Sequence, residues 1–249
     1  PEEKTNIPGI EAVAEADMMV IATRFRELPD DKMKYIDDYV QSGRPILGLR
    51  TATHAFNYTR NKDSKYAKYS FNSREWRGGF GQQVLGETWI NHHGGHKTES
   101  TRGIINEKFK DHPILRGVSD IWGPTDVYGV RNLGPDADVL VLGQVLKGME
   151  PDDPPVAGKK NDPIMPLLWT RSYTGASGKA SRIICTTMGA SVDLENEGLR
   201  RALVNSCFWG LEMDVPAESN VEIVGEFNPT FYGFGNFQKN VKPSAHVLQ

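Results

Sequence analysis

Residues 45–56 constrain the fold more than any other part of this 249-residue chain. An apolar run at 46–49 suits a buried strand, and the small and apolar residues after the turn suit a helix. Junctions of this kind in α/β enzymes carry a nucleophile or a ligand-binding residue. This one carries Arg50, Thr51 and His54 and no cysteine. It predicts the geometry of an active site without the expected nucleophile.

The residues before this junction complete a β-α-β unit. Residues 18–23 form an apolar run typical of a buried parallel strand. Residues 29–42 repeat apolar side chains at helical spacing, and Gly43 ends the helix. We therefore predict an α/β fold with a flavodoxin-like, doubly wound and mostly parallel sheet flanked by helices.

The start of the chain suggests that this sheet is incomplete. Residues 10–16 resemble the end of a helix that leads into the first strand. A doubly wound sheet has earlier β-α units near its centre, and each β-α-β unit needs roughly 30 residues. We expect that N-terminal β-α units are missing. The apolar edge left by a missing strand would favour a homo-oligomer.

The remainder divides into an irregular part, a strand-rich part and a tail. Residues 57–98 form an irregular insertion with a short helix at 80–85. A regular apolar repeat predicts a helix at 194–211. The tail at 215–249 contains a candidate strand at 221–224 and aromatic residues expected to pack on the domain or a partner: Phe231, Tyr232, Phe234 and Phe237. Further strands are expected at 103–105, 127–130, 139–146, 166–170 and 182–187.

Composition excludes several classes of protein. The net charge is −3 with no concentrated basic stretch, which argues against a nucleic-acid partner. No apolar run approaches the roughly 20 residues of a membrane span, and 38% hydrophobic residues suit a soluble protein. The compartment stays open between cytoplasmic and exported. Cys185 and Cys207 lie in apolar runs typical of free buried thiols, although a disulfide remains an alternative.

Three of the six histidines lie within five residues, at His92, His93 and His96. Imidazole is the commonest protein ligand for metals, so the cluster predicts a site for a divalent metal such as Zn. Substrate hydrogen bonding and a structural role are the alternatives. Neighbouring side chains of an extended segment point to opposite faces, so only one of His92 and His93 can easily join His96.

The residues of the junction offer binding and catalytic groups. His54 is expected in a pocket at the carboxyl ends of the strands, or packed against the sheet. Arg50 must either pair with a carboxylate, for which Glu87 and Asp126 are candidates, or bind an anionic or hydroxylated ligand. Thr51 is a ligand-binding candidate whose alternative role is helix capping.

Asp126 is a candidate for general acid–base chemistry or for ligand binding, and its alternative is a turn residue. Trp89 and Trp122 flank these polar clusters. Aromatic rings stack on sugars, although a packed core tryptophan is the common alternative.

Two stretches resemble a known family. Residues 45–56 resemble the strand–turn–helix of class I glutamine amidotransferase-like domains. The segments 169–173 and 181–189 resemble the late strands of its ThuA-like (trehalose utilisation) branch, and Asp126-Val127-Tyr128 is similar to an acidic-x-Tyr signature of that branch. The resemblance implies a ThuA-like domain over residues 1–214.

The chain departs from the amidotransferase pattern at the catalytic positions. Arg50 stands where an amidotransferase has cysteine, and Ala190 and Ser191 stand near its catalytic histidine. Glutamine hydrolysis needs a thiolate activated by a base, so we expect no amidotransferase activity. ThuA-like domains also often carry Gly-His after the late strand, where this chain has Gly189 and Ala190.

The resemblance implies a role in carbohydrate metabolism. We expect a hydrolase, lyase or isomerase acting on a sugar or an oxidised glycoside, with His54 or His93 as the base and Asp126 as the acid. Arg50, Thr51, Glu87, Trp89 and Tyr128 are the expected ligand-binding residues, with a small carbohydrate as the partner. The alternative is a non-catalytic carbohydrate-binding or assembly module derived from an amidotransferase-like enzyme.

Overall fold

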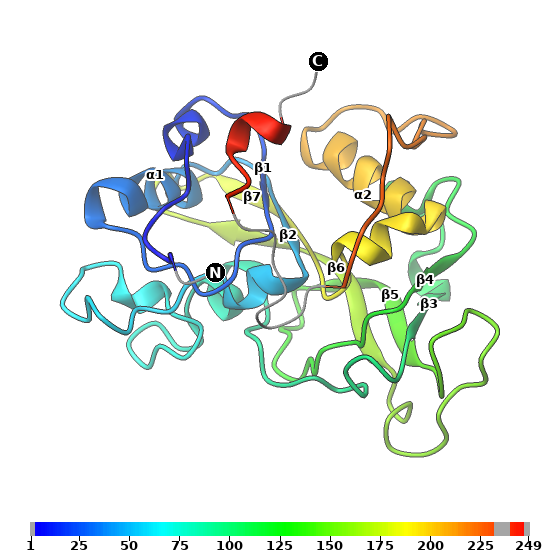
Figure 1. The fold of residues 1–249 in the computed structure, drawn as a ribbon. Coiled ribbons are helices and arrows are strands. Elements are labelled where there is room, and N and C mark those ends of the chain that lie inside the picture. The colour runs from blue at the N-terminus through cyan, green and yellow to red at the C-terminus, as the bar shows by residue number, and fades with distance from the viewer. Residues whose placement is uncertain (1–2, 232–239, 247–249) are drawn as a thin grey trace.

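A seven-stranded mixed sheet organises the computed structural model, which describes residues 3–231 and 240–246 (Figure 1). Its spatial order is β1-β2-β7-β6-β5-β3-β4. The strands are β1 (Met19–Ile21), β2 (Ile46–Leu49), β3 (Thr101–Ile105), β4 (Ile121–Gly123), β5 (Asp138–Val145), β6 (Met165–Thr174) and β7 (Ala180–Thr186). The predicted α/β class is confirmed.

The prediction of a mostly parallel sheet is wrong. Only β1–β2 and β2–β7 pair in parallel, and the other four pairings are antiparallel. The connection from β6 to β7 covers only residues 175–179, whereas a parallel crossover needs a dozen or more residues. Apolar runs identified the strands but carried no information on their direction.

The β-α-β unit at the start of the sheet agrees with its prediction. Helix α1 (Asp30–Gln41) follows Pro29 and buries Met33, Ile36 and Val40 on one face. The Tyr39 hydroxyl donates a hydrogen bond to the carbonyl of Pro45 at 2.9 Å, which ties the helix to the start of β2. A 3-10 helix, η1 (Ile10–Ala14), packs against α1.

The second helix is shorter than predicted. Residues 191–195 form a 3-10 helix, η7 (Ser191–Glu195), and α2 (Glu197–Gly210) begins only after Asn196. The Asn196 side chain caps α2 by accepting a hydrogen bond from the Leu199 backbone. This cap explains the break, because an Asn side chain that bonds to the backbone favours a helix start over a helix interior.

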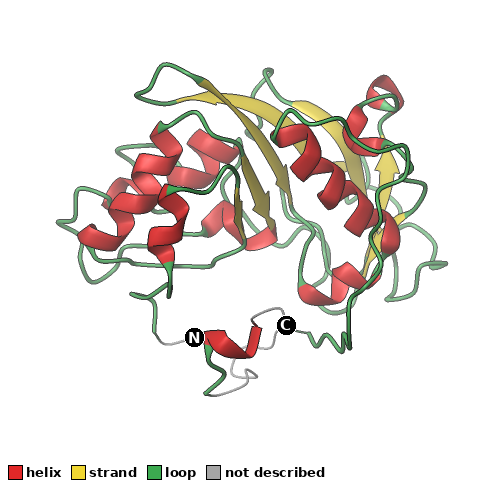
Figure 2. Ribbon diagram, turned by 90° about the horizontal axis from the view of Figure 1, so that it is seen from above, coloured by secondary structure: helices red, strands yellow, loops and turns green. Residues whose placement is uncertain are grey.

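Hydrophobic residues pack on both faces of the sheet. One cluster includes the α1 residues and Trp169, and the other includes residues of α2 such as Leu199. Figure 2 shows the two groups of helices on either side of the curved sheet. The Trp169 indole donates to the carbonyl of Leu85 at 2.8 Å and so anchors a π-helix, η4 (Gly81–Leu85), to β6.

Several predicted elements differ from those observed. The residues after Arg50 form a 3-10 helix, η2 (Arg50–His54), in place of an α-helix. Residues 127–130 form no strand beyond one isolated bridge between His92 and Tyr128, and residues 221–224 form none. The short helix predicted at 80–85 is η4. The remaining 3-10 helices are η3 (Ala67–Tyr69), η5 (Glu107–Phe109), η6 (Pro113–Leu115) and η8 (Pro243–His246).

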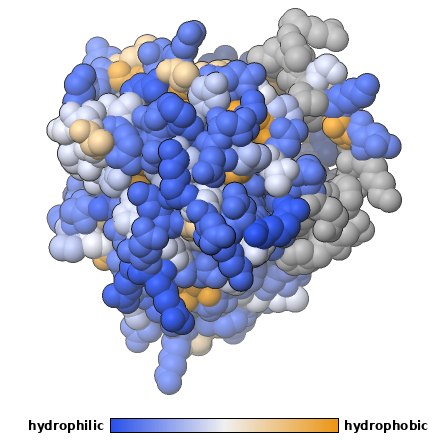
Figure 3. Space-filling model, turned by 90° about the vertical axis from the view of Figure 1, so that its left-hand side faces the viewer, coloured by the Kyte–Doolittle hydropathy of each residue, from blue (hydrophilic) through white to orange (hydrophobic). Residues whose placement is uncertain are grey.

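The irregular segment from residue 57 packs through aromatic side chains. Tyr69 contacts Phe56, Trp76 and Phe80 with ring centroids 5.0–6.4 Å apart. Seen from the side of α1, the surface is mostly hydrophilic, with only scattered hydrophobic residues (Figure 3). The insertion is irregular in backbone, but its buried aromatic side chains join the hydrophobic core that also contains the α1 residues and Trp169.

Among the described residues, no helix is both long and apolar enough to span a bilayer. Cys185 and Cys207 are free thiols, as the apolar runs around them predicted. Of the tail aromatics, Tyr232, Phe234 and Phe237 lie outside the described residues, and Phe231 lines a pocket of the domain.

Candidate functional site

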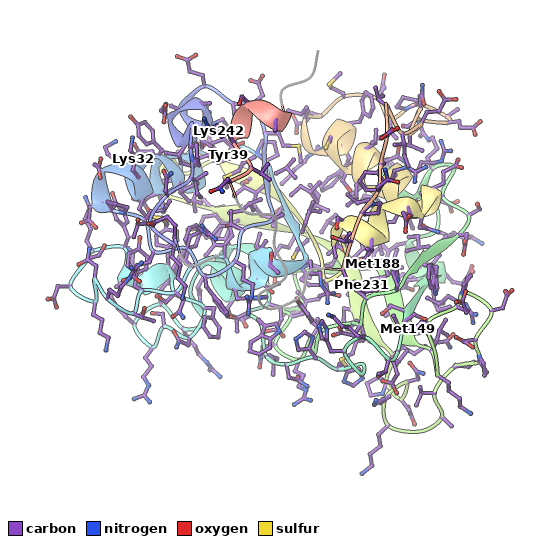
Figure 4. The ribbon with its side chains drawn as sticks, viewed as in Figure 1. Lys32, Tyr39, Met149, Met188, Phe231 and Lys242 are labelled. Carbon is purple, nitrogen blue, oxygen red and sulfur yellow. The ribbon has the colours of Figure 1, made fainter. Side chains whose placement is uncertain are left out.

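A pocket of about 690 Å³ lies at the carboxyl ends of the three parallel strands. Residues that follow β1, β2 and β7 line it, as expected for an open α/β sheet. The N-terminal segment and the tail residue Phe231 also contribute (Figure 4). The lining residues are Lys4, Asn6, Ile7, Pro8, Ala22, Thr23, Arg24, Phe25, Arg26, Arg50, Thr51, His54, Trp89, His92, His96, Thr125, Tyr128, Gly189, Ala190, Ser191 and Phe231.

Arg50 occupies the turn after β2 with a φ of 38°, in the left-handed region that non-glycine residues rarely adopt. Its buried guanidinium donates to the carbonyls of Asp126 at 2.9 Å and Thr187 at 3.0 Å. It also bonds to the Asp126 carboxylate at 3.3 Å and lies 4.4 Å from the centre of the Tyr128 ring. Of the two predicted carboxylate partners, the structure pairs Arg50 with Asp126.

Asp126 joins this arginine to two histidines. His92 Nδ1 lies 2.5 Å from one carboxylate oxygen and His96 Nδ1 lies 2.8 Å from the other. An ionised carboxylate only accepts hydrogen bonds, so each Nδ1 carries the hydrogen. The Nε2 atom of each neutral ring then has a lone pair available for a proton or a metal. The ring centroids of His92 and His96 lie 4.7 Å apart.

The surroundings of Asp126 keep it ionised. Burial alone would raise the pKa of this carboxyl group. The hydrogen bond from His92, the charge of Arg50 and the hydrogen bond from His96 outweigh burial and lower the pKa below its usual value. Asp126 is therefore suited to orienting the histidines, which differs from the general-acid role predicted from the sequence.

His54 lines the pocket but is only 4% exposed. Burial, together with the charges of Arg24 and Arg50, lowers its pKa to about 3. The imidazole is therefore neutral near pH 7 and serves as a hydrogen-bonding group. Its Nδ1 lies 3.2 Å from the Thr53 hydroxyl, and aromatic rings surround it, including Phe25 at 5.0 Å and Trp89 at 5.5 Å.

The other predicted ligand-binding residues divide into two groups. Thr51, Trp89 and Tyr128 line the pocket. The Thr51 hydroxyl donates to the carbonyl of Ala22 at 2.7 Å and so links the turns after β1 and β2. Burial raises the pKa of Tyr128, which keeps its hydroxyl protonated.

Glu87 and His93 lie away from the pocket lining. The Glu87 carboxylate accepts backbone hydrogen bonds from Arg131 at 2.6 Å and Asn132 at 2.7 Å, so it stabilises a loop. His93 Nε2 bonds to the carbonyl of Lys160 at 2.8 Å, on the opposite side from His92. Neighbouring side chains of an extended segment point to opposite faces, which predicted that His92 and His93 would have different partners. His93 is therefore not placed to act as the base or metal ligand that the sequence suggested.

Sequence reasoning missed the turn after β1. Thr23, Arg24 and Phe25 line the pocket just after β1, which the sequence had predicted as a strand. Ligands of open α/β sheets bind beyond the carboxyl ends of the parallel strands. This rule singled out Arg50 after β2, and it applies equally to these three residues after β1. Residues 4–8 and Thr125 carried no comparable signal, because only the tertiary fold brings them to the pocket.

The donor set can hold a metal ion. His92, His96 and Asp126 each offer a ligand atom, and these atoms lie within 4.8 Å of one another. Two imidazoles and a carboxylate are ligands that Zn²⁺ accepts. Without a metal, His92 and His96 are two bases whose orientation is fixed by the Asp126 carboxylate.

Comparison with known proteins shows which solved structures share this fold. No family model and no curated protein matches the sequence. Two crystal structures provisionally designated ThuA-like are similar at 14% sequence identity. One, from Bacteroides uniformis, has a TM-score of 0.51 and covers 82% of this chain and 73% of its own. The other, from Parabacteroides merdae, has a TM-score of 0.50 and covers 91% and 81%. The chain thus has the fold of the ThuA-like proteins, and the resemblance predicted from its sequence is confirmed.

Proposed function

We propose that this protein acts in carbohydrate metabolism as a hydrolase or lyase on a sugar or an oxidised glycoside. The observation that carries the proposal is the pairing of His92 and His96, which line a pocket with aromatic walls, with one buried carboxylate. Residues 1–214 act as a ThuA-like domain whose two parallel pairings correspond to part of a flavodoxin-like sheet. The tail supplies Phe231 to the pocket wall.

His92 is the general base in this proposal. Its Nδ1–H bond to Asp126 fixes the tautomer and leaves Nε2 ready to take a proton from a carbon or from water. Asp126 stabilises the imidazolium that forms, because it lies 2.5 Å from Nδ1 and stays ionised. Tyr128 and neutral His54 supply hydrogen bonds to substrate oxygens, and Trp89 offers a ring face to the sugar.

His92, His96 and Asp126 would hold a divalent ion such as Zn²⁺, which fits their imidazole and carboxylate donors. Such an ion polarises a carbonyl oxygen as a Lewis acid. Arg50 would then serve the site indirectly, since it positions Asp126 through three hydrogen bonds to that residue and to Thr187.

Turnover of a panel of glycosides and their keto derivatives tests the proposed reaction. The His92→Gln variant should lose at least 100-fold in kcat/KM, as expected for removing a general base. His93→Gln is the matched control, because His93 faces the Lys160 carbonyl. Equal activity of the His92 variant and the wild type would remove His92 from the mechanism.

Zinc titration by calorimetry tests the metal part separately. The His96→Ala variant should lose the zinc binding that His93→Ala keeps, because only His96 shares Asp126 with His92. Equal zinc affinity of both variants would contradict the metal site. Loss in both would point to unspecific binding by the whole histidine cluster.

A non-catalytic carbohydrate-binding module is the second candidate. Arg50 in the strained turn favours it, since the nucleophile position of the amidotransferase-like fold holds a residue without nucleophilic chemistry. Burial also raises the pKa of both cysteine thiols, so neither offers a thiolate for glutamine hydrolysis. Sugar binding without turnover of any panel member would favour the module.

A further inference from the structure

We infer that Asp193 is a positioning residue for the group formed by His92, His96 and Asp126. Its carboxylate holds the segment that carries Asp126 against the turn after β7, and so sets the place of the carboxylate that orients both histidines. The inference rests on the function proposed above for the use of this group. It concerns a buried carboxylate that the proposed reaction leaves without a role.

The Asp193 side chain lies fully buried in η7 and accepts hydrogen bonds at both of its oxygens. One oxygen accepts from the backbone N–H groups of Gly189 and Ala190, each at 2.9 Å. The same oxygen accepts from the Thr125 hydroxyl at 2.8 Å, and the other accepts from the Thr125 backbone N–H at 3.3 Å. A carboxylate has acceptor sites for all of these donors. Asp193 therefore joins the turn after β7 to the residue that precedes Asp126.

Helix capping accounts for only part of this arrangement. Asp193 is the third residue of η7, so its bond from the N–H of Ala190 satisfies the start of that helix. The two bonds from Thr125 come from a segment 68 residues away in the sequence. The bond from Ala190 would cap η7 without them, so the bonds from Thr125 serve the neighbouring segment.

Arg50 connects the same two segments through carbonyl groups. Its guanidinium donates to the carbonyl of Asp126 at 2.9 Å and to the carbonyl of Thr187 at 3.0 Å. Asp193 instead accepts from N–H groups on both segments. A buried cation and a buried anion thus both connect residues 125–126 to residues 187–190. Without Asp193 the connection loses its N–H half, and Asp126 can shift relative to the histidines.

The end of β4 leaves room for the Asp193 carboxylate. A Cβ at Gly123 would lie 2.5 Å from Asp193 Oδ1, the oxygen that accepts from the Thr125 backbone. Glycine has no Cβ, so the carboxylate can approach the strand end closely enough to make this bond.

The place of Asp126 matters because its two oxygens bond to two different rings. His92 Nδ1 lies 2.5 Å from one oxygen, and His96 Nδ1 lies 2.8 Å from the other. A shift of the carboxylate that lengthens either bond also frees the proton of that ring to move to Nε2. The proposed base and the proposed metal ligands both need Nε2 unprotonated, so Asp193 acts on them through Asp126.

Imidazole ¹⁵N NMR of the metal-free full chain, at one fixed pH, tests the inference. In the wild type His92 and His96 should show the tautomer that is protonated at Nδ1, because each Nδ1 faces Asp126. His93 is the internal reference. It should show the Nε2 tautomer, since its Nε2 bonds to the carbonyl of Lys160.

Two variants weaken the bonds of Asp193 in different ways. Thr125→Val keeps the shape of the side chain and removes the hydroxyl that donates to Asp193. Asp193→Asn replaces one acceptor oxygen by an NH₂ group, which cannot accept from an N–H. Both variants should give a mixture of tautomers at His92 or His96 and leave the spectrum of His93 unchanged. Thr125→Ser keeps the hydroxyl and should restore the wild-type tautomers.

Calorimetric zinc titration of the same proteins gives a second readout. The zinc affinity of Thr125→Val and Asp193→Asn should fall about tenfold or more, as expected for residues that hold metal ligands in place. Asn205→Ala is the control for lost stability. Asn205 is fully buried and donates to the carbonyls of Ile114 at 3.0 Å and Arg116 at 2.8 Å, away from the described pocket lining. This variant should lower Tm and keep the wild-type tautomers and zinc affinity.

The outcomes separate the inference from the proposed function. Wild-type tautomers and zinc affinity in both Thr125→Val and Asp193→Asn would reduce Asp193 to a helix cap and overturn the inference. A change of tautomers in Asn205→Ala would overturn it as well, because the histidines would then respond to any loss of stability. A wild type that binds no zinc contradicts the metal part of the proposed function, and the tautomers then decide the inference. A wild type whose His92 lacks the Nδ1 proton overturns both the proposed base and the inference.

Discussion

Asp126 is the residue on which the site depends. One buried carboxylate, 1% exposed, contacts the guanidinium of Arg50 and the imidazoles of His92 and His96. The sequence offered Asp126 and Glu87 as equal partners for Arg50, because both follow from composition and spacing alone. Their roles separate only in three dimensions, where Glu87 is occupied by the backbone of residues 131 and 132.

Replacing Asp126 by asparagine should lower the free energy of unfolding by about 3 kcal/mol, because Arg50 keeps a buried charge without its partner. Chemical denaturation measures this loss. Asp136→Asn is the control: Asp136 pairs with Arg171 at 3.0 Å but is half exposed, so its loss should cost at most about 1 kcal/mol. Similar losses in the two variants would mean that the Asp126 pair contributes no more than a surface pair.

His54 should make stability depend on pH. Its folded-state pKa of about 3 lies below the ordinary value of 6.5, so the unfolded chain binds the proton more readily. Its contribution is complete above pH 6.5 and is lost as the pH falls toward 3. The charges that face the ring, from Arg24, Arg50 and His92, act in the same direction as burial.

Unfolding free energies of the wild type and His54→Gln between pH 7 and pH 4 measure this dependence. The decrease in the wild type should exceed that in the variant by about 3 kcal/mol, since each pH unit contributes up to about 1.4 kcal/mol. Parallel curves for the two proteins would show that His54 does not titrate in this range.

At the scale of elements, the sequence identified helices and strands but did not indicate the direction of the strands in the sheet. The apolar periodicity of α1 and α2 identified both helices, and strands β2 and β7 agree with apolar runs to within two residues at each end. Strand direction depends on connections such as residues 175–179 and on tertiary pairing, which periodicity does not encode. The bridge of His92 to Tyr128 has the same origin: the antiparallel pairing of β3 with β4 places the residues before Thr101 and the residues after Gly123 at the same end of the sheet.

Two glycines of α2 should respond oppositely to the same substitution. A Cβ at Gly198 would lie 1.4 Å from the carbonyl oxygen of Asp120, so Gly198→Ala must displace backbone. At Gly210 the nearest atom is the flexible end of Met18, 3.1 Å away, which can move. Alanine favours helix over glycine by about 1 kcal/mol, and only Gly210 can gain from it.

Thermal unfolding of the two variants checks this prediction. Gly198→Ala should lower Tm by several degrees, because overpacking of this kind costs about 1–3 kcal/mol. Gly210→Ala should leave Tm unchanged or raise it. A Gly198 variant as stable as the wild type would mean that α2 shifts freely over residue 120.

At the scale of the whole molecule, the N-terminal segment and the tail residue Phe231 reach the pocket from outside the sheet. Residues 4–8 and Phe231 line it, and in Figure 1 the segment after α2 descends toward the carboxyl ends of β2 and β7. The hydroxyl of Ser191 donates to the carbonyl of Thr230 at 3.2 Å. No local pattern in the sequence predicts these contacts, because Ser191 and Thr230 are 39 residues apart and residues 4–8 lie at the far end of the sequence from Phe231.

The N-terminal segment should loosen when Arg26 loses its charge. Arg26 donates to the carbonyl of Glu3 at 2.8 Å, and the Glu27 backbone N–H donates to the carbonyl of Lys4 at 2.9 Å. A charge-assisted hydrogen bond contributes about 1.5–3 kcal/mol, so Arg26→Gln should speed amide hydrogen exchange in residues 4–8 about tenfold or more. Amides of β7, whose Ile183 and Ile184 are fully buried, should exchange as before.

Arg102→Gln is the matched control for this experiment. Its guanidinium holds a different loop through the carbonyls of Pro151 and Asp153. Exchange should increase near residues 151–153 in that variant and stay unchanged at residues 4–8. If Arg26→Gln left residues 4–8 as protected as in the wild type, contacts other than Arg26 would hold the segment over the pocket. An increase confined to Arg26→Gln means that one side chain in the turn after β1 controls how far the pocket is covered.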